Sequence, residues 1–239
     1  MRLSFFKILF LFSALYISAC GTQVQSVVQH TTVNLTAGDL KRDGLAFITP
    51  TTPTGMEEDK QYLALTFSQQ LKQELPNVGI LNLPQTLGVI NQNGFSETYF
   101  KMYDQYIITG LFTHDVLQEI GNMTGKRYLG QLKLANFANS TQGRWGFLGF
   151  RIIDTRSASI RLIFQIWDSH NGKIAWEGTQ ELNYATETIR ESPVTFELVI
   201  RRSATNLAKL LPGEKSPAIV VPANISKTDN DDFDTEEEF

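Results

Sequence analysis

The side chains best suited to chemistry in this chain of 239 residues are three histidines and one cysteine. Nucleophilic catalysis needs a serine or cysteine beside a histidine base, yet His30, His114 and His170 are far apart in the sequence. His114 is near Asp115 and Glu119, but one imidazole and two carboxylates without a further ligand are a weak metal signal. The sequence contains no phosphate-binding loop, dinucleotide-binding fingerprint or zinc-protease motif. We therefore expect no enzymatic activity, no catalytic residue, no metal site and no cofactor.

The amino terminus has the pattern of an export signal. Arg2 and Lys7 supply positive charge ahead of an apolar run at residues 8–17. This run is too short to span a bilayer, which needs about 20 apolar residues in a helix. We expect residues 1–19 to be a lipoprotein signal peptide.

The only cysteine, Cys20, directly follows the small residues Ser18 and Ala19. This junction resembles the bacterial lipobox, in which the cysteine is acylated, for example with palmitate, and becomes the first residue of the mature chain. Ordinary cleavage beside an incidental cysteine, or an uncleaved anchor, are the alternatives. Several acyl chains on one cysteine would hold the protein stably on a bilayer. Gly21 stands where an aspartate commonly signals inner-membrane retention, and this sorting convention favours the outer membrane.

Composition limits the remaining classes of protein. The chain is 42% hydrophobic and 19% charged, which suits one globular domain with a core and argues against a wholly disordered chain. Its 21 basic and 25 acidic residues give a formal charge of −4, so no basic surface for nucleic acid is expected. A single cysteine cannot form an internal disulfide.

The mature chain divides into three parts. Residues 20–43 are rich in Thr, Gln and Val without a helical period, and we expect a lipidated tether. Residues 44–212 should form one α/β domain. Residues 213–239 carry eight acidic residues and few apolar ones, and this composition predicts a disordered acidic tail. The tail either keeps the protein soluble or docks on a basic partner.

The domain alternates short apolar runs with helical periods. The patterns predict strands at 44–49, 78–83 and 106–112, and helices at 57–75, 86–90 and 96–103. Residues 121–150 contain six glycines and no clear period, so we expect a long, irregular connection there. A closing helix follows an expected cap at Ser192-Pro193, with apolar residues at helical spacing from Phe196 to Leu211.

A β-hairpin is the clearest element of the sequence. Apolar residues alternate from Ile160 to Trp167, and the chain returns from Lys173 to Tyr184. We expect structural roles for four hairpin residues, with Asp168 bonding the turn backbone and Trp176 sharing a face with Ile174; these four are Asp168, Asn171, Gly172 and Trp176. A ligand role for Asp168 or Trp176 is the alternative.

Three stretches together resemble a known group of lipoprotein domains. They are residues 44–75, the segment DQYIITG at 104–110 and the segment WDSHNGKIAWEG at 167–178. They are similar to the domain shared by the curli-secretion lipoprotein (CsgG-like), the Pel lipoprotein, the penicillin-binding-protein activator lipoproteins and the amino-terminal domain of TolB. The resemblance implies an α/β domain of three layers with a mixed sheet, a C-terminal β-hairpin and flanking helices. Asn171 stands where the group usually has Thr, and residues 121–150 lack clear alternating apolar strands, which puts a pore-forming role in doubt.

One segment combines a cation with large rings. Arg144, Trp145, Phe147 and Phe150 have the composition of interface hot spots and of membrane boundaries. The rings either fill the edge of the core, contact a neighbouring subunit or partner, or enter lipid.

These features predict a non-enzymatic periplasmic lipoprotein on the outer membrane, bound to the bilayer through Cys20. The resemblance implies a secretion or assembly accessory of the cell envelope that acts as a homo-oligomer or with an envelope protein. The alternative is a periplasmic binding module that recruits or activates a cell-wall enzyme.

Overall fold

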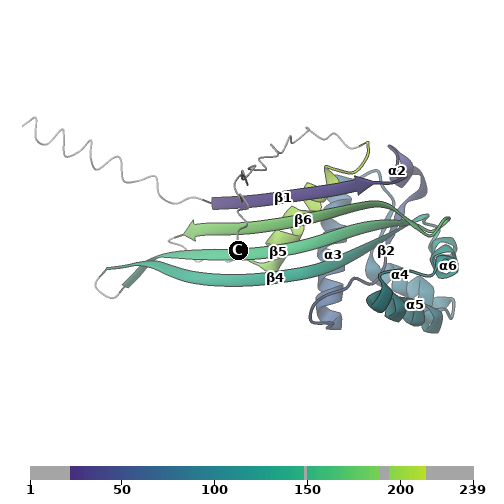
Figure 1. Cartoon of the computed structure of the whole chain (residues 1–239), viewed down its shortest axis with the longest axis horizontal. Helices are drawn as coiled ribbons and strands as arrows, with labels where there is room; N and C mark the ends of the chain where they lie inside the picture. Colours follow the sequence, from purple (N-terminus) through teal and green to yellow (C-terminus); the bar gives the residue numbers. More distant parts are fainter. Residues whose placement is uncertain (1–21, 148–149, 189–193, 214–239) are drawn as a thin grey trace, which may run out of the picture.

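The computed structural model describes residues 22–147, 150–188 and 194–213. Six strands form one mixed sheet in the order β1-β6-β5-β4-β2-β3, with helices on both faces (Figure 1). The strands are β1 (Thr22–Thr32), β2 (Leu45–Phe47), β3 (Ile80–Leu81), β4 (Tyr128–Phe147), β5 (Phe150–Asp168) and β6 (Lys173–Thr188). The helices are α2 (Asp39–Asp43), α3 (Glu57–Glu74), α4 (Leu83–Gln92), α5 (Ser96–Thr109), α6 (His114–Thr124) and α7 (Phe196–Ala208). The expected α/β domain with a mixed sheet and flanking helices is confirmed.

Helices α3 and α7 cover one face of the sheet. Leu63, Phe67 and Leu71 recur at four-residue steps, so they form one buried stripe on α3. The Phe67 ring lies 5.0 Å from Phe164 of β5, centroid to centroid. The expected helix at 57–75 is therefore confirmed.

Helix α7 begins later than its expected cap. Thr195 is the N-cap residue, and its side chain accepts a hydrogen bond from the Leu198 backbone N–H. The expected Ser192-Pro193 cap is wrong, because these residues precede the observed N-cap and lie outside the described residues.

Helices α4, α5 and α6 share a second core on the opposite face, at one end of the sheet. Its strand residues are Ala46, Leu129 and Trp167, and Phe112 stacks 4.0 Å from Tyr106 between centroids. This second core gives the domain its third layer.

The strand expected at 106–112 is instead the end of α5 and the loop after it. Tyr99, Met102, Tyr103 and Tyr106 are buried at helical spacing, and the Tyr103 hydroxyl donates to the Pro50 carbonyl. The apolar residues that suggest a buried strand, Ile107 and Ile108, are instead turned outward. The strand prediction fails because the buried face of a helix is set by residues three and four positions apart. The seven residues 106–112, taken alone, are too few to show that spacing.

The irregular connection expected at 121–150 is also wrong. Helix α6 extends to Thr124, and β4 follows as the longest strand of the sheet. Its pairing with β5 continues from Tyr128 to Phe147. Since β-propensity depends strongly on neighbouring strands, small and polar residues can form this strand when β5 supplies the ladder.

The tether expected at 20–43 is folded over most of its length. Residues 22–32 form β1, which pairs antiparallel with β6 from Thr22↔Thr186 to Thr32↔Trp176. A short helix, α2, follows at Asp39–Asp43. The described part of the chain therefore begins two residues after Cys20.

The two expected terminal segments lie outside the described part of the chain. They are the signal peptide at 1–19 and, apart from Gly213, the acidic tail at 213–239. Both stay predictions from the sequence.

Four strands extend beyond the helices as a long projection (Figure 1). We call this projection the arm and define it as β1, β6, β5 and the part of β4 beyond Leu134. The pairing of β4 with the body ends near that point, where the Leu134 N–H donates to the Thr51 carbonyl. The register aligns Thr22 with Thr186, Arg156 and Thr141 across the four strands. The start of β1 therefore lies toward the free end of the arm.

Candidate functional site

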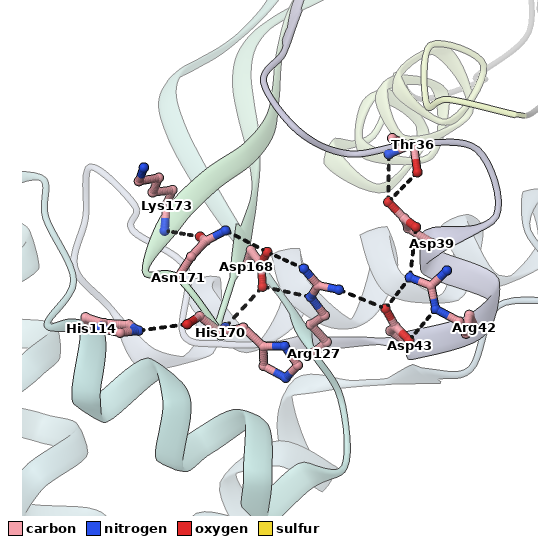
Figure 2. Close-up of polar contacts among 10 residues, drawn as sticks. All are labelled: Thr36, Asp39, Arg42, Asp43, His114, Arg127, Asp168, His170, Asn171 and Lys173. Carbon is pink, nitrogen blue, oxygen red and sulfur yellow. Dashed lines mark hydrogen bonds and ion pairs between the residues drawn. The ribbon is translucent and has the colours of Figure 1, made fainter.

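The hairpin turn is held by a buried carboxylate. Asp168, at the end of β5, is fully buried and accepts two hydrogen bonds from Arg127, at 3.0 Å from Nε and 2.8 Å from Nη2 (Figure 2). The His170 backbone N–H and the Asn171 side chain also donate to it, at 3.1 and 2.9 Å. Four donors satisfy both oxygens, so the carboxylate is fully engaged inside the protein.

The same arginine links the turn to α2. Arg127 Nη1 lies 3.5 Å from Asp43 Oδ2, and Asp43 accepts two hydrogen bonds from Arg42 (Figure 2). Arg42 also donates to Asp39, whose other oxygen accepts from the backbone and hydroxyl of Thr36. We call Asp39, Arg42, Asp43, Arg127 and Asp168 the ionic chain.

The pKa values of the ionic chain fit a structural role. Burial alone would raise the pKa of Asp168, but hydrogen bonds from Arg127 and the His170 backbone, with the Arg127 charge, lower it below its usual range. The hydrogen bond to Asp168 raises the pKa of Arg127. Hydrogen bonds from Arg42 lower the pKa of Asp43 despite its desolvation. General acid-base catalysis works best with a pKa near the operating pH, so this chain of fixed charges is poorly suited to proton transfer.

The other hairpin residues complete the turn. Asn171 accepts from the Lys173 backbone N–H at 2.9 Å through Oδ1. Gly172 has a φ of 68°, a backbone conformation that glycine adopts without strain. The expected bond from Asp168 to the turn backbone is present, because the His170 N–H donates to its carboxylate.

Trp176 packs in the core beneath α7. Its ring lies 5.8 Å from Phe164 between centroids and is fully buried. The expectation that it shares a face with Ile174 is wrong: Ile166 pairs with Trp176 and Trp167 with Ile174, so Ala175 is an extra residue in a β-bulge. The bulge places Ile174 in the core beneath α5 and α6.

The histidines do not form a metal site within the described residues. No group of three His, Cys, Asp or Glu side chains there could hold an ion. His114 Nε2 instead lies 3.1 Å from the His170 carbonyl, which joins α6 to the hairpin turn (Figure 2).

The structure does not describe the side chains of two of the predicted functional regions. Arg144, Trp145 and Phe147 lie at the end of β4 and Phe150 begins β5, but their side chains are outside the described part of the chain. Cys20 is outside it altogether. Among the helices of the described residues, none has the length and apolar character needed to span a membrane.

The arm has two edges without a partner strand among the described residues. Along one edge, β1 pairs only with β6, and along the other, β4 beyond Leu134 pairs only with β5. The sequence of β1, TQVQSVVQHTT, contains no Lys, Arg, Asp, Glu or Pro. Soluble proteins usually protect a long edge strand with such residues, so β1 has the properties of an edge that accepts another strand.

Sequence reasoning missed a second exposed feature, the outer side of α5. Phe100, Ile107, Ile108 and Leu111 are between 58% and 79% exposed. We call these four residues the α5 patch. A period of 3.6 residues applied to 96–109 would have revealed most of it, because positions 100, 107 and 108 fall on one side of a helix; Leu111 follows just beyond the helix end.

Comparison with known proteins gives similarity of structure at low sequence identity. No protein-family model matches the chain, and no curated protein matches its sequence. A solved PelC dodecamer from Paraburkholderia phytofirmans is similar with a TM-score of 0.40 and 14% identity, covering 80% of this chain and 99% of that one. Lipoprotein GNA1162 from Neisseria meningitidis is similar with a TM-score of 0.37 and 11% identity, covering 69% of this chain and 96% of that one. The Pel lipoprotein is one of the groups that the sequence motifs resemble. Similarity at this level does not assign a function.

Proposed function

We propose that this protein is a lipid-anchored, non-enzymatic accessory of the bacterial cell envelope that assembles through the edges of its arm. The observation that carries the proposal is the uncharged, proline-free edge formed by β1. An unpaired strand of this kind gains backbone hydrogen bonds when another strand pairs with it. The occupant proposed here is β4 of a second copy.

The directions of the strands support pairing between copies. The three antiparallel pairings β1-β6, β6-β5 and β5-β4 leave β1 and β4 running in opposite directions. If β1 of one copy pairs with β4 of the next, the antiparallel order continues from copy to copy. Such head-to-tail contacts are heterologous, and they form a ring when the rotation closes.

The proposed anchor supports the same arrangement. Acylation of Cys20 attaches lipid two residues before β1, so the free end of the arm would face the bilayer. All copies would then stand on the membrane in one orientation, which favours contacts between arm edges side by side. The proposed location is the periplasmic face of the outer membrane.

The anchor and the assembly have separate tests. Mass spectrometry of the mature protein should find acyl groups on Cys20 and no residues 1–19; an unmodified cysteine or an intact leader would contradict the anchor. For assembly, native mass measurement should detect oligomers of the mature chain carrying Cys20→Ser. The variant Gln25→Lys/Gln29→Lys adds edge charges and should reduce those oligomers. Gln69→Lys/Gln73→Lys adds the same charges to exposed positions of α3 and should leave them intact. A strictly monomeric parent chain would reject self-assembly.

A second candidate function is recruitment of an envelope enzyme by a periplasmic binding module. The exposed α5 patch favours it, because large contiguous apolar patches commonly mark protein-binding surfaces. Pull-downs with two pairs of variants separate the two functions. Loss of self-association in Trp145→Ala and Phe147→Ala, at the tip of the arm, would favour the first function, and loss of an enzyme partner in Ile108→Ser/Leu111→Ser would favour the second.

A further inference from the structure

Helix α5 has apolar residues on two sides, although only one side is covered. Its inner side buries three tyrosines and Met102. Its outer side exposes Phe100, Ile107 and Ile108, and Leu111 follows just beyond the helix end. Large apolar side chains grouped on the exposed side of a helix are typical of a surface that a partner covers, and the outer side of α5 has this pattern.

The α5 patch has the size and shape of a helix-binding surface. Four large apolar side chains that are mostly exposed present on the order of 500 Å² together, similar to the largest apolar patch on a typical monomer. Positions 100, 104, 107 and 108 follow one stripe along the helix, and Leu111 follows just beyond its end. A second helix laid along such a stripe would contact it over several turns.

The charges beside the patch are mainly acidic. Asp104 lies within the stripe and is exposed. Asp115, in the first turn of α6, has a side chain that is 94% exposed, with its carboxylate 3.8 Å from His114 Nδ1. The one lysine of α5, Lys101, is 2.7 Å from Glu97 and is neutralised by it. These charges complement a basic partner.

The position of α5 argues against lipid as the occupant. Helix α6, which follows α5, contacts the hairpin turn through His114, and Thr113 donates to Gln105 of α5. This turn is at the opposite end of β6 from Thr186, which pairs with Thr22. The length of β1 separates the hairpin turn from the level of Thr22 by about 35 Å along the strands. An anchor at Cys20 would therefore hold the bilayer far from the patch, and acidic groups would repel anionic lipid.

A second copy is also a poor occupant. Two α5 patches placed face to face would bring Asp104 and Asp115 of both copies close together, at a cost from like charges. The tail at 214–239 is itself acidic, so its charge does not complement this surface. The occupant whose charge complements the α5 patch is therefore a basic segment of another protein.

We infer that the α5 patch binds an amphipathic helix of an envelope protein, with apolar residues toward Ile107 and Ile108 and with Lys or Arg toward Asp104 and Asp115. The inference rests on the proposed function for the orientation of the protein on the membrane. It adds the chemical class of the partner and a surface separate from the arm.

The test uses the mature chain with Cys20→Ser and a defined probe. The probe is a fluorescent synthetic peptide with Leu at positions i, i+4, i+7 and i+11 and Lys on its polar side; the control peptide has Glu in place of Lys. The lysine peptide should bind at least tenfold more tightly than the glutamate peptide. Ile108→Ser/Leu111→Ser should weaken its binding by tenfold or more, because each large apolar side chain contributes about that factor on burial. Asp104→Asn/Asp115→Asn should reduce the preference for lysine.

Val33→Ser is the matched control, because Val33 is 61% exposed and follows the edge strand β1 rather than belonging to α5. It should leave peptide binding unchanged, and all variants should unfold at the same temperature as the parent. Equal affinity for both peptides, or binding that Ile108→Ser/Leu111→Ser does not reduce, would overturn the inference.

Two further readouts identify other occupants. Phosphatidylethanolamine-phosphatidylglycerol vesicles that bind the parent but not Ile108→Ser/Leu111→Ser would assign the patch to lipid and reject a helix partner. A fall in native mass for the same variant would assign it to a second copy. Peptide binding requires neither acylation nor arm pairing, so failure of this inference and failure of the proposed function give different results.

Discussion

Replacing Asp168 with asparagine tests whether the ionic chain holds the hairpin to the body. The substitution preserves the size of the side chain but replaces one carboxylate oxygen with an amide group. In the parent, both carboxylate oxygens accept hydrogen bonds, from Arg127, Asn171 and the His170 backbone. An amide NH2 in place of one oxygen cannot accept them. Arg127 also loses its buried counter-charge.

The expected cost follows from the burial of the two partners. Removing one member of a buried ion pair typically costs about 3–5 kcal/mol. The Asp168 side chain is 1% exposed, but that of Arg127 is 31% exposed and can partly recover water. We therefore expect a loss of about 3 kcal/mol in the free energy of unfolding, at the low end of that range.

Urea unfolding followed by circular dichroism measures this loss. A double-mutant cycle with Arg127→Met should give a coupling energy of at least about 1.5 kcal/mol. The matched control is the exposed pair Lys101 and Glu97, for which Lys101→Met/Glu97→Gln should show coupling below about 0.5 kcal/mol. A loss below about 1 kcal/mol for Asp168→Asn, or coupling no larger than the control, would refute the role of the ionic chain.

The pH dependence gives an independent check on the same residue. Because the folded-state pKa of Asp168 lies below its unfolded value, its stabilising contribution is present above about pH 4 and is lost as the pH falls through the folded value. The difference between the parent and Asp168→Asn should therefore stay constant from about pH 8 to about pH 5 and shrink in more acidic solution. A difference that grew on acidification would have the wrong sign.

Three further predictions concern separate parts of the molecule. In urea unfolding, Gly178→Ala should destabilise the fold by about 2 kcal/mol, because its Cβ would overlap Trp176 and lie 2.8 Å from Leu207. Gly88→Ala, in open space on α4, should instead stabilise the fold by about 0.5 kcal/mol. Equal effects of the two substitutions would contradict the close contact of Gly178 with Trp176 and Leu207. Thr195→Ala should cost about 1 kcal/mol by removing the cap of α7, and Thr195→Ser should restore most of it in thermal unfolding. In bilayers containing brominated lipid, the tryptophan fluorescence of the lipidated parent should be quenched, and that of Trp145→Phe should not. The reason is that β4 continues beyond the level of Thr22, toward the bilayer, whereas Trp167 and Trp176 are buried. Equal quenching in the parent and the variant would exclude lipid contact at Trp145.

The parts of the fold predicted from sequence are those in which local pattern and tertiary burial agree. Along β5, Ile160, Leu162, Phe164 and Ile166 alternate with less buried residues, so the period of two identifies both the strand and its core face. On α3, four-residue spacing gives the buried stripe directly. Each of these elements packs one side against the core, so the spacing of its apolar residues is enough to predict both its type and its buried side.

The errors come from elements whose pattern depends on a neighbour. Strand β1 has exposed residues on both sides and is held by its ladder to β6, so its sequence gives little periodic signal. At 106–112 the apolar run predicts a buried strand, whereas Ile107 and Ile108 face outward. The bulge at Ala175 likewise shifts Trp176 relative to Ile174 through pairing with β5, which no local pattern encodes.

The ionic chain escapes prediction for a related reason. The hairpin motif predicts that Asp168 bonds the turn, but its partner Arg127 is 41 residues earlier and enters only when β4 pairs with β5. Charged residues near each other in sequence give no indication of this pair. The geometry of the sheet, rather than the hairpin motif, therefore determines which charge neutralises the turn.

The two ends of the molecule differ in ways that make their proposed roles separable. At the arm, the edge strand β1 carries no formal charge and offers backbone groups, so its interactions should depend little on salt. At the other end, the α5 patch joins apolar side chains to Asp104 and Asp115, so binding of a basic helix should weaken as ionic strength rises. Raising the salt concentration should therefore release the lysine peptide while leaving arm-mediated oligomers intact. If both were lost together, a single surface would have to serve both interactions, and the division of the molecule into an assembly end and a partner-binding end would fail.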